Sequence, residues 1–522
     1  MKRTALITGT AVLAAVVGLT AGSATAASTR HEAETSPAVC SGTIDSNWSG
    51  FSGSGFCNGD NATGAYAQFT VNASAAGTAT IGVRFANGAT SSRPTNLIIN
   101  GSTVQTPSFE STGAWNTWAT KTLTVNLNSG SNTIRFHPTT SAGLANIDYI
   151  DVESGGTPPP PPPGNALYVA PNGSDSAAGT ESNPTTLTSA ITRVAPGGTI
   201  YLRGGTYRFS QTVTIAAGNN GTSTARKRLA AYPGERPVLN FSAQSEDPAN
   251  RGLALNGNYW HVHGVIVERA GDNGIFIGGS NNIIERTVTR FNRDTGLQLS
   301  RMLSSTPKDQ WPANNLILSA ESHDNADSDG EDADGFAAKL TSGPGNVFRY
   351  AVAHNNIDDG WDLYTKTDTG PIGVVTIEDS LAYENGTLSN GGQAGNGDRN
   401  GYKLGGEDIG VNHVIRRSIA YDNGKHGFTY NRNPGTMTVS NNISIGNAQR
   451  NFTFDAGSSV FRNNTSCDSG SNDRIVGDAD GSNQFWNGAN GSRCANLTGS
   501  LGWSFAADGR LVVTLGGRVV NP

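Results

Sequence analysis

Four aspartates and one lysine lie at related places in three similar segments of the chain. They are Asp334, Asp358, Asp359, Asp362 and Lys403. Each lies within two residues of a glycine that an aromatic residue follows. A cluster of carboxylates suits a hard cation, and calcium accepts irregular oxygen coordination more readily than magnesium does. A lysine beside such a cation should lose its proton more easily, and a neutral lysine is a competent general base.

A repeat in the sequence positions these residues. A glycine followed directly by an apolar residue recurs after turns that are rich in Asn and Asp. The glycines are Gly274, Gly296, Gly335, Gly360, Gly401 and Gly427, and Asn451-Phe452 is a seventh case. The successive steps are 22, 39, 25, 41, 26 and 24 residues. A base period of 22 to 26 residues with two enlarged steps predicts a solenoid, and a right-handed parallel β-helix of roughly ten coils fits best.

Stacking the coils in register sorts the side chains into columns. The positions one and three residues after each glycine are mostly apolar and should face inward. The position between them should face outward, and it places Asp362 and Lys403 on adjacent coils about 4.8 Å apart. The two enlarged steps predict loops over residues 301–314 and 384–400 that wall the acidic patch into a groove.

The first 26 residues have the features of an export signal. Lys2 and Arg3 precede an apolar run, and Ala24-Thr25-Ala26 matches a cleavage site. We therefore expect a secreted, extracellular protein with no membrane segment after cleavage. Its four cysteines form two local pairs, which predicts the disulfides Cys40–Cys57 and Cys467–Cys494. The formal charge of −6 and the lack of a basic tract argue against a nucleic-acid partner.

A proline run divides the chain into two unlike parts. Residues 158–163 are all proline, so residues 155–165 are predicted to be an extended linker. Short alternating runs before it predict a β-sandwich of the jelly-roll type over residues 30–154. The predicted β-helix spans residues 166–522, and the fold class is therefore all-β.

The predicted sandwich resembles carbohydrate-binding modules of families 35 and 6. The resemblance rests on Glu32-Ala33-Glu34, on residues 114–118 (AWNTW) and on residues 146–150 (NIDYI). It implies that Glu32, Glu34 and Asp148 hold a structural calcium ion and that Trp115 and Asn146 contact sugar. Trp115 could equally be a core residue, because a loop-edge aromatic serves either purpose.

Residues 166–480 resemble polysaccharide lyase family 9, the pectate lyases with a parallel β-helix. The matching segments are residues 333–336 (ADGF), 358–362 (DDGWD) and 400–406 (NGYKLGG). The resemblance implies that the four aspartates named above ligate calcium and that Lys403 is the base. Lys339, Arg399 and Lys425 lie on or near the groove and are candidate partners for substrate carboxylates, although such residues also populate ordinary surfaces.

The sequence thus predicts a monomeric, calcium-dependent pectate lyase that cleaves polygalacturonate in plant cell-wall pectin by β-elimination. Three alternatives stay open. The substrate could be rhamnogalacturonan or another uronate polymer. The protein could instead be a polygalacturonase, which would use paired acids without an essential lysine or metal. It could also be a β-helix that only binds polysaccharide.

Overall fold

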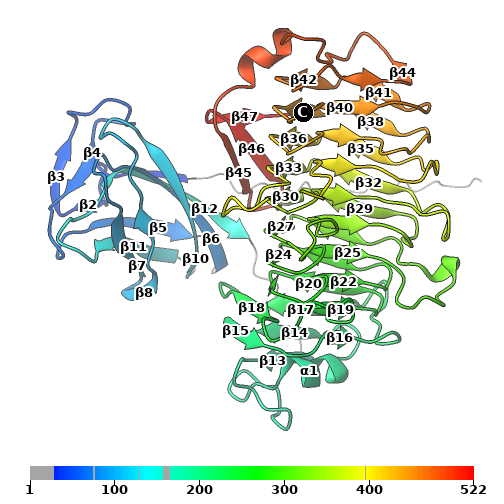
Figure 1. Ribbon diagram of the computed structural model, residues 1–522. Coiled ribbons are helices and arrows are strands. Elements are labelled where there is room, and N and C mark those ends of the chain that lie inside the picture. Colours follow the sequence, from blue (N-terminus) through cyan, green and yellow to red (C-terminus); the bar gives the residue numbers. More distant parts are fainter. Residues whose placement is uncertain (1–28, 74–76, 129, 157–164, 394) are drawn as a thin grey trace, which may run out of the picture. The chain divides into compact units, whose positions relative to one another are not determined.

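The computed structural model describes residues 29–73, 77–128, 130–156, 165–393 and 395–522. The chain forms two compact units, residues 1–155 and 156–522. Nearly all the regular structure is β-strand, as predicted (Figure 1). The predicted signal peptide and most of the predicted linker lie outside the described residues. Among the residues that are described, we find no helix with the length and apolar character needed to cross a bilayer.

The N-terminal unit consists of two antiparallel sheets around one apolar core, which confirms the predicted sandwich. One sheet has the order β10 (Ala119–Leu127), β6 (Gly77–Ala86), β12 (Asn146–Gly156), β4 (Phe56–Gly59) and β3 (Gly42–Asp45), with β1 (Thr29–Glu32) paired to β12. The other has the order β2 (Val39–Cys40), β5 (Ala67–Ala73), β11 (Gly130–Pro138), β7 (Arg93–Ile99) and β8 (Ser102–Gln105), with β9 (Ser108–Phe109) paired to β7. The predicted disulfide Cys40–Cys57 is present.

The C-terminal unit is a parallel β-helix with three long sheets (Figure 1). Sheet 1 contains β13 (Ala166–Val169), β14 (Thr199–Leu202), β17 (Lys227–Ala231), β20 (Trp260–His263), β23 (Ile283–Glu285), β26 (Leu316–Leu318), β29 (Asn346–Arg349), β32 (Val375–Glu378), β35 (Val414–Arg416), β38 (Thr438–Ser440), β41 (Val460–Arg462) and β44 (Asp478–Ala479). The short helix α1 (Leu187–Arg193) packs its buried side chains into the apolar core of the first coils.

Sheets 2 and 3 have ten strands each, in agreement with the predicted coil number. Sheet 2 contains β15 (Gly205–Arg208), β18 (Pro237–Asn240), β21 (Ile266–Glu268), β24 (Val288–Arg290), β27 (Glu321–His323), β30 (Val352–His354), β33 (Leu381–Tyr383), β36 (Ile419–Tyr421), β39 (Ile443–Ile445) and β42 (Thr465–Cys467). Sheet 3 contains β16 (Val213–Ile215), β19 (Leu253–Leu255), β22 (Ile275–Ile277), β25 (Leu297–Leu299), β28 (Phe336–Ala338), β31 (Trp361–Asp362), β34 (Tyr402–Lys403), β37 (Phe428–Thr429), β40 (Phe452–Phe454) and β43 (Arg474–Ile475).

The recurring glycines precede the strands of sheet 3, at a turn that is crowded by buried asparagines. A Cβ atom on Gly274 would lie 2.5 Å from the side-chain nitrogen of Asn292, and one on Gly335 would lie 2.8 Å from that of Asn356. The asparagines bond to one another from coil to coil, for example Asn356 Nδ2 to Asn385 Oδ1 at 3.0 Å. These bonds satisfy buried backbone and side-chain groups at the turn, which keeps successive strands in register.

The last residues differ from the prediction, which continued the β-helix to residue 522. The parallel strands end at β44, and the short 3₁₀ helix η2 (Ser492–Asn496) follows. The chain then forms a three-stranded antiparallel sheet of β45 (Leu501–Phe505), β46 (Leu511–Leu515) and β47 (Arg518–Val520). Its apolar side chains join a core with residues of sheet 2, so this sheet covers an outer face of the β-helix. The predicted disulfide Cys467–Cys494 ties η2 to β42.

Candidate active site

Sheet 3 carries the predicted columns in the predicted register. Trp361 lies beside Phe336 on one side and Tyr402 on the other, and all three rings are fully buried in the core. Asp362 pairs with Lys403 across β31 and β34, on the opposite side of the sheet. Both residues are nevertheless less than a tenth exposed, because loops and neighbouring side chains surround them. The alternation of the strand therefore aims Asp362 and Lys403 out of the core into a sheltered site.

Lys403 is in contact with three carboxylates. Its Nζ atom lies 3.2 Å from Asp359 Oδ2, 3.6 Å from Asp362 Oδ2 and 3.1 Å from Asp398 Oδ2. Asp359 and Asp362 belong to the predicted cluster, whereas Asp398 was not predicted. The ammonium group of the last residue of β34 is thus held among carboxylates.

Three of the four predicted aspartates converge on one point. Asp334, Asp358 and Asp359 each offer a carboxylate oxygen within 4.8 Å of the others, and all three are buried. Asp362 lies at the edge of this group, and its Oδ1 atom is buried without a hydrogen-bond partner. The four residues come together because their coils stack in register, as predicted from the repeat. Their role as metal ligands stays a prediction.

Lys339 lies inside the cluster. Its Nζ atom is 2.7 Å from Asp334 Oδ2 and 3.5 Å from Asp362 Oδ2, and the side chain is buried. The sequence makes this residue a candidate partner for substrate carboxylates on or near the groove. Its charge has two carboxylate partners within the cluster, and a contact with substrate stays a prediction.

The loop between β33 and β34, one of the two predicted loops, bonds to the aspartates through its backbone. The amides of Asp398 and Arg399 donate to Asp358 Oδ1, the latter at 3.2 Å. The amide of Asn400 donates to Asp359 Oδ1 at 2.6 Å. The end of the loop therefore orients two of the predicted ligands.

Asp398 joins two lysines across this loop. Its carboxylate contacts Lys403 at 3.1 Å and Lys425 Nζ at 2.6 Å. Lys425 is half-buried and is paired with Asp398. Arg399 is also half-buried, and its Nε atom lacks a hydrogen-bond partner. Both therefore lie at the edge of the cluster, and their contact with substrate stays a prediction. Asp398 itself carries no repeat signal in the sequence, because it lies in a loop outside the columns.

The electrostatics of the site follow from burial and from the crowding of like charges. Burial raises the pKa of Asp359 to about 6, although Lys403 opposes this shift. Burial raises the pKa of Asp334 and of Asp358 well above the ordinary value, and neighbouring carboxylates add to the effect. Burial alone would lower the pKa of Lys403, but the surrounding carboxylates, Asp362 foremost, raise it above its usual range. The carboxylates thus favour the ammonium form of the lysine, and the predicted effect of a bound cation on this pKa stays a prediction.

The three predicted calcium ligands of the N-terminal unit surround the turn at residues 52–54. The Ser52 amide donates to both oxygens of Asp148 at 3.1 Å, and the Ser52 hydroxyl donates to Glu32. The amide of Ser54 donates to Glu34 Oε1 at 2.8 Å, while Glu34 Oε2 is buried without a partner. Burial raises the pKa of Asp148 to about 6. Glu32 and Glu34 near the start of the unit and Asp148 near its end are therefore brought to one turn.

Trp115, one of the two predicted sugar contacts, lies near Arg93, which was not predicted. Trp115 is half-buried, and the Arg93 guanidinium lies 5.1 Å from the centre of its ring. Arg93 also donates to the Leu144 carbonyl at 2.8 Å, two residues before Asn146. Asn146 is buried at the start of β12. The assignment of Trp115 and Asn146 to sugar binding stays a prediction.

Each of the two units matches the model of a known protein family. Residues 167–472 match the model described as the Pel9A-like, right-handed β-helix region. Residues 33–154 match the carbohydrate binding module of family 6. The second match agrees with the predicted resemblance of the N-terminal unit.

Individual proteins agree with the family models. The chain is 57% identical over 336 residues to a pectate lyase L of Paenibacillus polymyxa, covering 64% of this chain and 75% of that protein. It is 33% identical to the crystal structure of pectate lyase Pel9A, with a TM-score of 0.58, covering 68% of this chain and 89% of that one. A segment covering 22% of this chain is 45% identical to part of an endo-1,4-beta-xylanase B of Cellvibrio japonicus, 19% of that protein. The chain therefore belongs to polysaccharide lyase family 9, the Pel9A-like β-helix enzymes, and carries an N-terminal carbohydrate-binding module.

Proposed function

We propose that the protein is a secreted, calcium-dependent pectate lyase that cleaves polygalacturonate by β-elimination, with Lys403 as the general base. The observation that carries this proposal is the placement of the Lys403 ammonium 3.2 Å from Asp359 and 3.6 Å from Asp362, at the edge of a buried acidic cluster. The 57% identical relative is named a pectate lyase, which supports polygalacturonate as the substrate.

The acidic cluster fits a calcium ion. Its donors are oxygens only, three of them converge within 4.8 Å, and Asp362 Oδ1 is a buried oxygen that lacks a hydrogen-bond partner. Asp334, Asp358, Asp359 and Asp362 would hold the ion. When bound, calcium would neutralise the carboxylate of the substrate sugar and stabilise negative charge on it.

The residues of the chain itself account for the proton transfer. Neutral Lys403 Nζ takes the proton from the ring carbon next to the sugar carboxylate. The electron pair of that C–H bond forms a ring double bond. The bond from the neighbouring carbon to the glycosidic oxygen breaks, and this oxygen leaves with the electron pair and takes a proton from water. The carboxylates that raise the pKa of Lys403 must be neutralised before it can act as this base. Asp398 orients the amine from the solvent side.

In the N-terminal unit, Glu32, Glu34 and Asp148 would hold a structural calcium ion, and Trp115 and Asn146 would contact sugar. The convergence of the three carboxylates on the turn at residues 52–54 supports the first assignment. Such a module would hold the enzyme, which we propose acts as a monomer, on plant cell-wall polysaccharide and raise its local concentration there.

Ultraviolet absorbance of the unsaturated product tests the proposed reaction. The mature protein with polygalacturonate and calcium should give a steady rise in absorbance, and excess chelator should stop it. New reducing ends without absorbance would indicate a hydrolase instead. If neither signal appears with polygalacturonate, the same assay with rhamnogalacturonan and other uronate polymers decides between another lyase substrate and a protein that only binds polysaccharide.

Calcium should stabilise the protein more at pH 7 than at pH 5. A carboxyl with a raised folded-state pKa stabilises the fold below its ordinary pKa, and this contribution is lost as the pH rises through the raised value. For Asp359 that value is about 6, so without calcium its contribution is lost between pH 4 and pH 6. Calcium binds the ionised carboxylate and thereby restores the stability that is lost. Thermal unfolding with calcium and with chelator at both pH values measures this difference.

The N-terminal carboxylates would contribute to the same effect, since the pKa of Asp148 is also about 6. The double variant Glu32→Gln/Glu34→Gln separates their share. An equal calcium shift at pH 5 and pH 7 in that variant would contradict the assignment of calcium to the buried cluster of the β-helix.

A further inference from the structure

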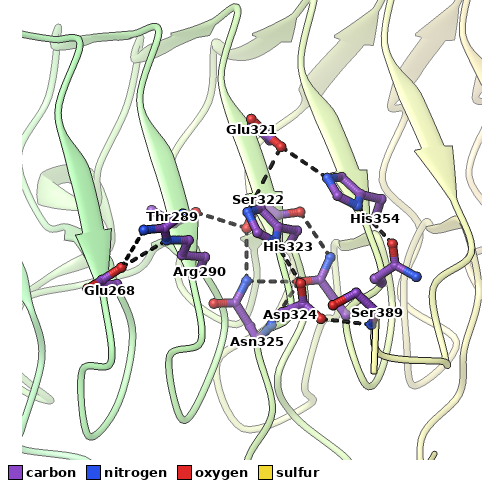
Figure 2. Close-up of polar contacts among 12 residues, drawn as sticks. Glu268, Thr289, Arg290, Glu321, Ser322, His323, Asp324, Asn325, His354 and Ser389 are labelled. Carbon is purple, nitrogen blue, oxygen red and sulfur yellow. Dashed lines mark hydrogen bonds and ion pairs between the residues drawn. The ribbon is translucent and has the colours of Figure 1, made fainter. Parts of the chain in front are cut away.

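In two adjacent coils, a histidine ends the strand of sheet 2 and the residue after it contacts the same loop (Figure 2). In the first, His323 Nδ1 lies 2.7 Å from Asp324 Oδ2, and Asp324 Oδ1 accepts the Ser389 amide at 2.8 Å. Because a carboxylate only accepts, His323 must donate from Nδ1. Asp324 is less than a tenth exposed and adopts φ +54°. It therefore links the β-helix wall to the loop of residues 384–400.

The second contact repeats the first one coil later. His354 Nδ1 lies 2.9 Å from Asn355 Oδ1, and Asn355 Nδ2 donates to the Thr387 carbonyl at 3.0 Å. Asn355 is also buried and adopts φ +51°. The two buried residues thus bond the same loop at positions two residues apart. Each is oriented by the histidine that precedes it.

The histidines are themselves held in place. Their rings stack 4.9 Å apart at an interplanar angle of 9°, and the Tyr383 ring stacks on His354 at 4.6 Å. Glu321 Oε1 lies 3.1 Å from His354 Nε2 and 4.0 Å from His323 Nε2, on the far side of both rings from the loop (Figure 2). Four side chains from three neighbouring strands therefore fix the direction in which Asp324 and Asn355 point.

The same loop ends at the candidate active site. Its residues 398–400 bond Asp358 and Asp359 through backbone amides, and Asp398 contacts Lys403. Near its start, Gly386 lies against the Arg399 stem, and a Cβ atom there would be 2.5 Å from Arg399 Cβ. The two ends of the loop are thus packed together, which connects the segment of Thr387 and Ser389 to the residues that border the site.

We propose that Asp324 and Asn355, each oriented by its histidine, are positioning residues for the loop of residues 384–400. They hold the loop in the conformation that presents Asp398 and the amides of residues 398–400 to the site. This inference rests on the proposed function. Loss of one contact lowers the fraction of molecules with an ordered loop, and the apparent affinity for substrate falls in proportion to that fraction.

The variants Asp324→Ala and Asn355→Ala test this proposal in the full chain. Each should raise the KM for polygalacturonate about tenfold, if the ordered fraction falls to about a tenth, while kcat changes less than about twofold. Hydrogen exchange should increase in peptides that cover residues 384–393. Asp324→Asn should have a KM close to that of the wild type. Its amide oxygen still accepts a hydrogen bond from the Ser389 amide, and its nitrogen can donate one to neutral His323.

Asp468→Ala is the matched control. Asp468 occupies the same corner after β42, with φ +49°, and bonds Asn490 instead of the loop. Alanine has the same unfavourable positive φ at both corners, so a loss of stability from backbone strain appears in both variants. The proposal is wrong if Asp324→Ala and Asp468→Ala have the same KM and the same exchange in the loop. Failure of the wild-type protein to form unsaturated product would overturn the proposed function instead.

Discussion

Replacing Lys403 with alanine should reduce the rate of unsaturated product formation by a factor of about 100 to 10,000, which is the usual contribution of a general base. The fold should survive, because Lys403 lies on the outer side of β34 and the buried column of sheet 3 does not include it. Initial rates of absorbance change on polygalacturonate at saturating calcium measure the effect. KM should change little, since the lost interaction acts on the proton in the transition state.

Two further variants sharpen this test. Lys403→Arg keeps the positive charge near Asp359 and Asp362 but supplies a guanidinium that stays protonated, so it should be as inactive as the alanine variant. Lys366→Ala removes an exposed lysine from the same domain and should retain full activity. Substantial activity in Lys403→Arg would show that the charge of this residue matters and that another group removes the proton.

The part of the site that lies on strands could be predicted from the sequence. Asp362 and Lys403 each lie two residues after a repeat glycine, so the alternation of a strand and the stacking of coils were sufficient to bring them together. Asp334 and Asp359 each precede a repeat glycine and meet for the same reason. A periodic pattern predicts distances between residues that are far apart in the chain, because every coil repeats the same path.

The part of the site that lies on loops could not be predicted in the same way. Asp398 reaches Lys403 from an enlarged step of the repeat, where no column applies. His323 and His354 do lie in register, but their importance depends on the loop that Asp324 and Asn355 contact, and no local pattern indicates where a loop folds back. The terminal sheet of β45 to β47 escaped prediction for a related reason. Its short apolar strands resemble those of a coil, and only its antiparallel pairing distinguishes them.

Asp362→Asn should raise the calcium concentration needed for half-maximal activity at least about 100-fold. Partners outside the coordination shell are already worth 10 to 100-fold in metal affinity, and a direct ligand should be worth more. Asp362 is the best position for this test because its contacts are few. It forms ion pairs with Lys339 and Lys403 at 3.5 and 3.6 Å, and its other oxygen has no hydrogen-bond partner. Asparagine preserves the shape of the side chain and removes its charge.

The control for this variant is Asp398→Asn, which changes a carboxylate that also contacts Lys403 but lies outside the predicted ligand set. Calcium titrations should therefore separate the two: Asp398→Asn should lower the maximal rate and leave the half-saturating calcium concentration close to that of the wild type. Calorimetric titration supplies a readout that is independent of activity. If both variants shifted the calcium requirement equally, Asp362 would act only through the charge around Lys403, and the ion would be held by Asp334, Asp358 and Asp359 without it.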